Sequence, residues 1–426
     1  SCIHKLVSEQ HFILGPLFTE EKGEFIWLPH LFYAETGISQ QLEKILKSPS
    51  KLREIETEKA IDWSEKTLKI ELAQQQRSAV ETSLKEKFHI ITGGPGTGKS
   101  TITNAILKIL QKLTSKIVLA APTGRAAKRL SEITQKEAKT IHSLLEFDFK
   151  TMGFKRNKDN PLEADLIIVD EASMIDTSLM YSLLKAVPLH TRLIFVGDIY
   201  QLPSVGPGNV LRDMIDSKQF KVTTLTEIFR QAAGSKITLN AHRINEGQFP
   251  ITDNSSDSDF FFLPLSDPEH IKQKIVQLIC QRLPKRYQLD PRKDIQLLIP
   301  MKRGPIGIEV MNATLQQALN PHPKSGIPRG GQVFCDGDKV MQIRNNHKKE
   351  VSNGDIGWIT LIDEANAEIH VNFEGKDVSY TTSELDQLTL AYAISIHKYQ
   401  GSECPCIIMP VHPCHYKLLH RNLLYT

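Results

Sequence analysis

Residues Ile90–Thr103 read IITGGPGTGKSTIT, and this stretch decides the fold. It places a Gly-x-x-x-x-Gly-Lys-Ser loop between an apolar run and a run whose apolar residues have helical spacing. Glycines let the backbone turn with its N–H groups facing inward, so the loop and the positive end of the next helix can surround a polyphosphate. The residues expected to contact a nucleotide are Gly93, Gly94, Pro95, Gly96, Thr97, Gly98, Lys99, Ser100 and Thr101.

Two side chains of this loop have separate expected roles with ATP. Lys99 would reach the terminal phosphates, and the hydroxyl of Ser100 would ligate Mg²⁺. The alternative is a glycine-rich turn that merely precedes a helix, which the flanking strand pattern and the helical period of residues 101–113 disfavour. The loop alone predicts triphosphate binding and leaves open how the energy is used.

Bulk composition describes an ordinary globular chain. With 426 residues it is too long for one core, so about two to four domains are expected. A net charge of +3 from 52 basic and 49 acidic residues does not by itself favour a nucleic-acid partner. No apolar run would cross a bilayer and no secretory signal is recognisable at residues 1–10, so we expect a cytoplasmic protein without a membrane partner.

The six cysteines are scattered, which suits a reducing compartment better than a disulfide framework. A zinc site is considered where His and Cys gather near the end of the chain. It is disfavoured because no second Cys-x-x-Cys pair exists and the run CPCIIMPV has the pattern of a strand. The residues in question are Cys404, Cys406, His412, Cys414 and His415.

The stretch Ala164–Asp176, ADLIIVDEASMID, predicts a buried parallel strand that ends at two acidic residues. Ligands bind at the carboxyl ends of such strands. Asp170 is placed to hold Mg²⁺ through water, and Glu171 is the candidate base for an attacking water. The alternative is that both acids cap the helix that follows.

Three further side chains are candidates for the same site. Gln201 follows the apolar run at 192–196 and could sense the γ-phosphate through a water. The amide of Gln76 could pair with the edge of adenine. Arg230, from the second half of the chain, could neutralise γ-phosphate charge, although many arginines lie merely at the surface.

Strand and helix patterns alternate in two regions, about 68–222 and 223–426. Short alternating strands at 333–387 interrupt the second region and suggest a small inserted β-barrel. Residues 1–67 have the pattern of short helices, and the polar stretch 252–260 is expected to be a solvated loop.

Ten segments in one order resemble the RecD-like (exodeoxyribonuclease V alpha-subunit type) branch of superfamily 1 DNA helicases, from about residue 20 onward. They are GGPGTGKST, LAAPTGRAAKRLSE, TIHSLLE, IIVDEASMID, FVGDIYQLPSVGPGNVL, LTEIFRQ, PMKRGPIG, GDKVMQIRNN, NGDIG and AYAISIHKYQGSE.

The resemblance implies an α/β fold with two RecA-like P-loop NTPase motor domains, with ATP between them and 5′-to-3′ movement along single-stranded DNA. The implied parts are a helical N-terminal region (1–67), a first motor domain (68–222) with a β-hairpin near 146–160, a second motor domain (223–332 plus 388–426) and an SH3-like insert (333–387).

The resemblance also implies contacts with single-stranded DNA and its junctions with duplex, and RecB- and RecC-like subunits as partners. Glu403 would lie in a segment that couples DNA to the nucleotide. Either histidine of the DNA set could instead be a packing residue, and aromatic residues of the hairpin could stack on bases or only on one another. The implied DNA contacts are Pro122, Thr123, Gly124, Arg125, Lys128, His142, His397 and Lys398.

In the family, the chain continues beyond Thr426 into a Thr-Arg pair whose arginine enters the ATP site. Turnover by this chain alone is therefore expected to be impaired, since such a charge is worth about three to five orders of magnitude. One alternative is a nucleotide-dependent DNA-binding subunit without autonomous unwinding, and another is a P-loop kinase or transporter ATPase that needs no nucleic acid.

Overall fold

The computed structural model describes residues 11–16, 24–148, 151–228, 234–256, 258–346 and 348–426. Its contacts divide the chain into two units, residues 1–122 with 127–229 and residues 123–126 with 230–426. Each unit has its own sheets and its own buried clusters of apolar side chains. None of the helices in these ranges combines the length and apolar character that crossing a membrane requires.

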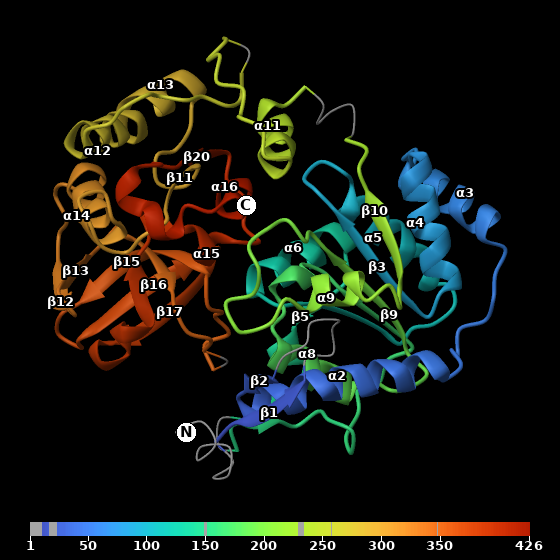
Figure 1. The fold of residues 1–426 in the computed structure, drawn as a ribbon. Helices are drawn as coiled ribbons and strands as arrows, with labels where there is room; N and C mark the ends of the chain where they lie inside the picture. Colours follow the sequence, from blue (N-terminus) through green and yellow to red (C-terminus); the bar gives the residue numbers. More distant parts are fainter. Residues whose placement is uncertain (1–10, 17–23, 149–150, 229–233, 257, 347) are drawn as a thin grey trace. The chain divides into compact units, whose positions relative to one another are not determined.

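The first unit is built on a six-stranded sheet of order β10-β3-β9-β8-β4-β5, in which every neighbouring pair is parallel (Figure 1). Strands β3, β8 and β9 are buried at every position, as expected for a parallel sheet covered on both faces. The strands are β3 Phe88–Gly93, β4 Ile117–Ala121, β5 Ala138–Thr140, β8 Leu166–Val169, β9 Arg192–Gly197 and β10 Lys221–Leu225.

Alternate residues of one strand serve the two faces of this sheet. In β9, Leu193 and Phe195 pack in the cluster that α2, α8 and α9 cover, whereas Ile194 and Val196 pack beneath α3, α4 and α5 (Figure 1). The helices of this unit are α2 Pro29–Lys47, α3 Thr57–Leu68, α4 Gln74–Lys85, α5 Lys99–Leu110, α6 Gly124–Thr134 apart from residues 124–126, α7 Ile141–Leu144, the 3₁₀ turn Ala172–Met174, α8 Thr177–Ala186 and α9 Val210–Asp216.

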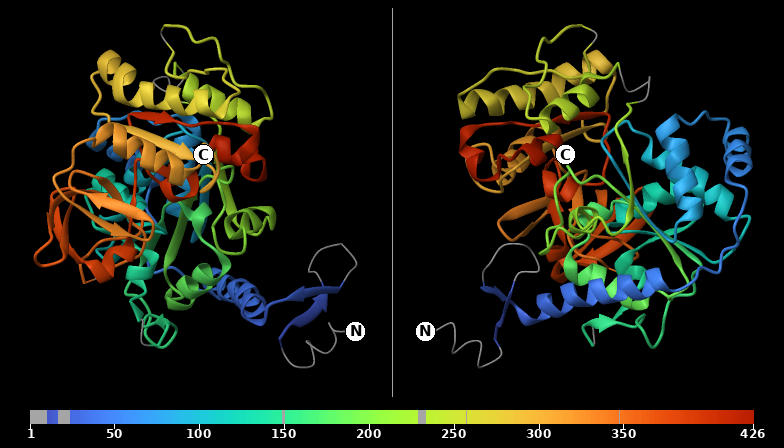
Figure 2. Two further views of the ribbon diagram at one scale, coloured as in Figure 1. Left: turned by 90° about the vertical axis from the view of Figure 1, so that its left-hand side faces the viewer. Right: turned by 45° about the vertical axis from the view of Figure 1, so that its right-hand side comes forward.

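Two β-hairpins extend from the first unit. Strands β6 Phe147–Asp148 and β7 Gly153–Phe154 form a short hairpin within the stretch 146–160. Strands β1 Ile13–Pro16 and β2 Glu24–Trp27 form another just ahead of α2, seen in blue in Figure 2. The sequence predicts only short helices for residues 1–67 and so misses this second hairpin. Its two strands are only four residues long and show little alternation of apolar and polar residues.

The second unit contains a small parallel sheet, β19-β11-β20, and a five-stranded antiparallel sheet, β17-β16-β15-β14-β18. A β12–β13 hairpin precedes the larger sheet. The strands are β11 Ile295–Ile299, β12 Gly326–Arg329, β13 Gln332–Cys335, β14 Lys339–Gln342, β15 Ile356–Asp363, β16 Glu368–Phe373, β17 Lys376–Thr381, β18 Leu388–Leu390, β19 Ala393–Ser395 and β20 Cys406–Ile408.

Helices of the second unit contact its parallel sheet. One buried cluster of apolar side chains includes residues of β11, α12 and α14 together with residues of the antiparallel strands, so the inserted sheet shares a core with the parallel one. The helices are α11 Lys236–Asn245, α12 Pro268–Gln277, the π-helical turn Leu278–Arg282, α13 Leu283–Tyr287, α14 Ile308–Leu319, α15 Ile396–Tyr399 and α16 Arg421–Tyr425, with 3₁₀ turns at Thr382–Gln387 and Pro413–Leu418.

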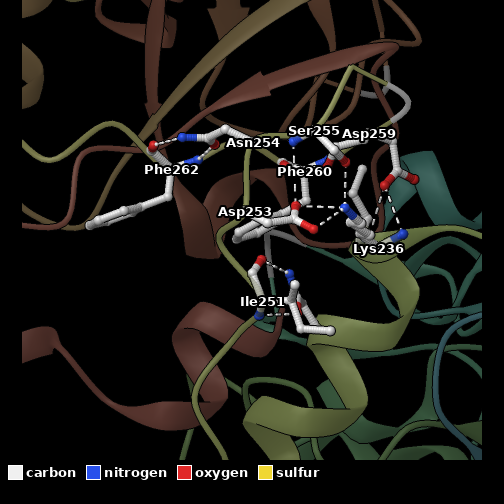
Figure 3. A network of polar contacts seen from close by, with 11 residues as sticks. Lys236, Ile251, Asp253, Asn254, Ser255, Asp259, Phe260 and Phe262 are labelled. Atoms are coloured by element: carbon white, nitrogen blue, oxygen red, sulfur yellow. Dashed lines mark hydrogen bonds and ion pairs between the residues drawn. The ribbon is translucent and has the colours of Figure 1, made fainter.

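The polar loop after α11 is mostly exposed but is bound back to that helix (Figure 3). The ammonium of Lys236 donates to both carboxylate oxygens of Asp253, at 2.6 and 2.8 Å, and to Ser255. The carboxylate of Asp259 accepts from the Ser235 hydroxyl and from the backbone N–H of Lys236 at the start of α11. The described residues of this stretch form a mostly exposed loop, as its composition predicts, and charged and capping residues bind that loop to the start of α11.

Candidate functional site

The glycine-rich loop runs from the end of β3 to the start of α5. Gly96 and Gly98 have φ angles of 75° and 80°, in the left-handed region that favours glycine. A Cβ on Gly93 would lie 2.8 Å from the Cβ of Leu225 and 2.8 Å from the Thr97 hydroxyl. Both the backbone conformation and the close approach therefore require glycine in this loop.

Lys99 lies over the loop at the first position of α5. Its Nζ donates to the carbonyl oxygens of Gly93, at 2.7 Å, and Gly94, at 3.1 Å. The hydroxyl of Thr97 donates to the Gly94 oxygen at 2.8 Å, and Ser100 and Thr101 follow in the first turn of the helix. The lysine charge and the N–H groups of the helix end are thus concentrated where a phosphate group would bind.

Gln76 is 2% exposed and bonds to the same loop. Its Nε2 donates to the Thr97 carbonyl at 3.0 Å, and its Oε1 accepts from the Ala73 backbone N–H at 3.0 Å, at the start of α4. An amide has two N–H groups and two lone pairs on oxygen, so one of each remains for pairing with adenine. The adenine contact stays a prediction.

Asp170 and Glu171 follow directly after β8. The backbone N–H of Asp170 donates to the Ala120 carbonyl at 2.9 Å, and its carboxylate accepts from the Glu171 N–H at 2.9 Å. Glu171 has a φ of 51°, a left-handed conformation that is uncommon for a residue with a side chain. Its Oε2 is buried and, among the described residues, has no hydrogen-bond partner. Strained backbone and an unpaired buried carboxylate oxygen are features of functional sites.

The two carboxylates are electrostatically linked. Burial raises the pKa of Asp170, which the bond from the Glu171 N–H and the charges of Lys99 and Arg129 oppose. Burial, and then the charge of Asp170, raise the pKa of Glu171 to about 7. A carboxylate with a pKa near neutrality is suited to accept a proton during a reaction.

Residues around these carboxylates fit a hydrated magnesium ion. In the part of the chain that the structure describes, the hydroxyls of Thr92 and Ser173 are also buried without a partner. Thr92 pairs in register with Gly197 of β9, and a Cβ on Gly197 would lie 3.1 Å from the Ser173 nitrogen, so these groups share one edge of the sheet. Mg²⁺ is held by one or two carboxylates, waters and substrate phosphates, which this set of oxygens can provide with Ser100.

The loop after β9 places Gln201 on a tight turn. Asp198 is fully buried, its carboxylate accepts from the Tyr200 N–H at 3.0 Å, and its carbonyl accepts from the Gln201 N–H at 3.2 Å. Gln201 is half-buried just beyond the carboxyl end of the strand. Its role as a γ-phosphate sensor stays a prediction.

Two residues that the sequence does not single out take part in this region. The charge of Arg129, on α6, lowers the pKa of both Asp170 and Glu171. The amide oxygen of Gln75 accepts from the Thr226 N–H at 2.9 Å, and so holds the segment after β10 against α4. Arg129 lies four residues after Arg125, a helical spacing that could have indicated it.

The predicted DNA contacts of the first half of the chain lie directly after β4 and on α6 and α7. Pro122 and Thr123 follow β4, the Thr123 hydroxyl accepts from the Ala126 N–H at 3.2 Å, and Gly124, Arg125 and Lys128 belong to α6.

The ring of His142, on α7, lies 5.7 Å from the ring of Phe154, which in turn lies 5.2 Å from the ring of Phe147. The hairpin aromatics therefore pack on one another and on the histidine, whatever else they contact. Phe149, the third aromatic residue considered for base stacking in the hairpin, lies outside the described residues.

The remaining predicted residues lie in the second unit. His397 and Lys398 are on α15, whose N-cap Ser395 accepts from the Lys398 N–H at 3.3 Å. Burial lowers the pKa of His397, which favours its neutral form. The side chain of Glu403 is exposed, and its carbonyl accepts from the Tyr399 hydroxyl at 3.1 Å. Arg230 lies outside the described residues.

The cysteine and histidine cluster does not form a metal centre in the described ranges, where no group of three or more His, Cys, Asp or Glu side chains is arranged to hold an ion. The thiol of Cys404 donates to the Asp294 carbonyl at 3.1 Å, and Cys406 and Cys414 pack against the apolar core of the second unit.

Family models match three parts of the chain. They describe an AAA domain at residues 76–207, an ATP-dependent RecD-like DNA helicase SH3 domain at 311–373 and a UvrD-like helicase C-terminal domain at 390–426.

Curated relatives match over most of the chain. The ATP-dependent RecD2 DNA helicase of Deinococcus radiodurans is 34% identical over 417 residues, which are 97% of this chain and 55% of that protein. The RecBCD enzyme subunit RecD of Buchnera aphidicola subsp. Acyrthosiphon pisum is 31% identical, with 82% of this chain and 69% of that protein covered. The chain thus spans about half the length of the first relative and about two thirds of the second.

A solved structure has a similar fold. The Pif1 helicase from Bacteroides, in complex with ADP-AlF3 and ssDNA, aligns with a TM-score of 0.50 at 19% identity and covers 84% of this chain and 90% of that one. The expected α/β fold, with two RecA-like domains and an SH3-like insert, is confirmed. On the length and identity of these matches, the chain belongs to the RecD-like family of superfamily 1 helicases.

Proposed function

We propose that the chain is the motor part of an ATP-dependent DNA helicase that moves 5′-to-3′ along single-stranded DNA in recombination and repair. The observation that carries this proposal is the unpaired buried oxygen of Glu171, on the same sheet edge as the Lys99 loop, in a chain of the RecD-like family. A loop that binds triphosphate, together with a carboxylate poised as a base, is what hydrolysis requires.

Each of the described site residues would have its own role in ATP hydrolysis. Lys99 would exchange its two loop carbonyls for phosphate oxygens, and Ser100 and Asp170 would hold Mg²⁺. The ion, when bound, neutralises charge that develops on the phosphate oxygens. Glu171 would accept a proton from the attacking water at Oε2, and Gln201 would orient that water.

Further residues complete the proposed ATP and DNA sites. Arg230 would neutralise negative charge on the γ-phosphate, and the amide of Gln76 would pair with the edge of adenine. Glu403 would couple the DNA contacts to the nucleotide. DNA phosphates are recognised by positive side chains, hydroxyls and helix N-termini, which the proposed set supplies. That set is Pro122, Thr123, Gly124, Arg125, Lys128, His142, His397 and Lys398.

The test compares variants of the full-length protein in DNA-stimulated ATP hydrolysis and in unwinding of 5′-tailed and 3′-tailed duplexes. Lys99→Ala should abolish nucleotide binding, whereas Lys108→Ala, in the last turn of the same helix, should not change it. Glu171→Gln should bind ATP and DNA but hydrolyse ATP far more slowly than the wild type. Absence of any DNA stimulation in the wild-type protein, or unwinding only from 3′ tails, would contradict the proposal.

A second function is a nucleotide-dependent DNA-binding subunit without unwinding of its own. Several relatives are named subunits of RecBCD, which favours this alternative and would make RecB- and RecC-like proteins the partners. Salt-dependent binding to single-stranded DNA, with hydrolysis that appears only when partner subunits are added, would support it.

A further inference from the structure

Helix α14 carries a row of three amide side chains. Asn312, Gln316 and Asn320 are spaced by four residues, the first two on the helix and the third at its C-cap. Side chains at this spacing lie one above another on a helix. Such a row would ordinarily be assigned to the solvated face of the helix. Here all three amides bond to the chain at the two ends of the SH3-like insert. Residues 333–338 form the entering segment, and residues 391–393 form the leaving segment.

The entering segment is held by two of these amides. Gln316 Nε2 donates to the Val333 carbonyl at 2.8 Å and to Asp338 Oδ2 at 2.5 Å. Asn320 Nδ2 donates to the Asp336 carbonyl at 2.8 Å and to Asp338 Oδ1 at 2.9 Å. Both N–H groups of each amide are thereby used, which leaves neither side chain free to turn away.

Asp338, fully buried, is the centre of the arrangement. In addition to the two amides, its Oδ2 accepts from the Cys335 N–H at 2.7 Å and its Oδ1 accepts from the Tyr392 hydroxyl at 3.0 Å. Each carboxylate oxygen therefore accepts two hydrogen bonds. Because Tyr392 belongs to the leaving segment, this single side chain joins both ends of the insert to α14.

The leaving segment has its own amide contacts. Asn312, 1% exposed, donates to the Ala393 carbonyl and accepts from the Ala393 N–H, both at 2.9 Å. Gln296, on β11 and fully buried, donates to the carbonyls of Ala391 and Tyr392 at 3.2 and 3.1 Å. These contacts hold the first residue of β19 and the two residues ahead of it, and β19 leads directly into α15, the helix that carries His397 and Lys398.

We propose that Asn312, Gln316, Asn320 and Asp338 form a rigid joint, which makes the SH3-like insert and α15 move as one body when the helicase steps along DNA. The role of the joint in stepping along DNA rests on the proposed function. The joint itself does not, because all four residues lie in the second unit and bond there. The shared apolar core adds to it, because one buried cluster contains side chains of β11, α14 and the inserted strands. These four are positioning residues, and the DNA strand is the ligand whose contacts they keep in register.

A distance measurement tests the joint without DNA or ATP. Spin labels are placed through unnatural amino acids at Leu361 on β15 and Tyr287 on α13, which are 53% and 44% exposed. The wild-type chain should give one narrow distance distribution. Asp338→Asn should broaden it, because an amide presents N–H groups to some of the four donors, whereas Asp363→Asn, the same change at the solvent-facing end of β15, should not.

Milder variants decide the outcome if Asp338→Asn does not fold. Tyr392→Phe removes one donor and keeps the buried ring, and Asn320→Ala removes an amide at the helix end, so each should broaden the distribution less. A distribution as narrow as that of the wild type in the folded variants would overturn the joint.

A second readout concerns DNA. Affinity for single-stranded DNA should fall by about two- to thirtyfold in Asp338→Asn, the range found when a coupling element is loosened, while Mg·ATP binding stays unchanged. If the wild-type protein bound no DNA, the proposed function would fail and the distance measurement would still decide the joint. Equal DNA affinity and equal distances in variant and wild type would refute the inference.

Discussion

We expect His89 to make the stability of the first unit depend on pH. It is fully buried on β3, four residues before Gly93, with Nδ1 2.7 Å from the Ser83 hydroxyl and Nε2 2.9 Å from the Thr223 hydroxyl. The Ser83 hydroxyl already donates to the Ala79 carbonyl, so it accepts from Nδ1–H, and Nε2 accepts from Thr223. The surroundings thus favour a neutral ring with its proton on Nδ1.

The size of the pH effect on the free energy of unfolding follows from the shift in the pKa of His89. Burial lowers the pKa of His89 from 6.5 to about 4, so in the folded state the ring stays neutral where the unfolded chain is protonated. The unfolded state therefore binds more protons between these two values, and the free energy of unfolding falls as pH decreases from 6.5 towards 4. The full effect is about 3 kcal/mol, of which about 2 kcal/mol is lost between pH 7 and pH 5.

The assay is urea unfolding of the wild type and of His89→Gln at pH 7 and pH 5. The substituted amide can donate to one hydroxyl and accept from the other without titrating, so the variant should be less stable at pH 7 but should lose about 2 kcal/mol less on acidification. His30→Gln, an exposed position on α2, serves as the control and should follow the wild type. Equal losses in the wild type and in His89→Gln would refute the reasoning.

Three other changes are expected to have measurable effects. Glu171→Gln should lower the rate of ATP hydrolysis by about two to four orders of magnitude and remove the wild-type loss of rate below about pH 7, measured as a pH–rate profile. Gly208→Ala should destabilise the first unit by about 1–3 kcal/mol in thermal unfolding, because its φ is 107° and a Cβ would lie 1.9 Å from a hydroxyl of α8, whereas Gly234→Ala meets no atom within 4 Å and should be near neutral. Tyr380→Phe should destabilise the SH3-like insert by about 1–2 kcal/mol in urea unfolding, because the buried hydroxyl donates to Gln342 at 2.9 Å, and an unchanged midpoint would contradict that contact.

The phosphate loop and the acidic strand end could be predicted because their signals are local. Glycines at 93, 96 and 98 and the apolar run before Asp170 each specify a backbone shape within about ten residues, and the structure has strand, loop and helix in that order. The position of these parts along one sheet edge also follows from the rule for parallel strands.

Contacts between distant residues could not be predicted in the same way. The sequence offers Gln76 as a possible adenine contact, but nothing in it indicates that this amide bonds to Thr97. Gln75 contacts Thr226, 151 residues away, and only the pairing of β3 with β10 brings them together. The short hairpin β1–β2 could not be predicted because four-residue strands give too little alternation to be distinguished from loop.

The amides of α14 show why an inserted domain leaves such a weak signal in sequence. An insert between α14 and β19 interrupts the alternation of helix and strand, and backbone carbonyls at both of its ends, those of Val333, Asp336 and Ala393, accept hydrogen bonds from side chains. Asn and Gln provide two donors each, and Gln316 and Asn320 use both on the entering segment. Polar residues at helical spacing ordinarily indicate a solvated face. Where a β-rich insertion follows the helix, the same spacing equally indicates the side chains that bind the insert in place.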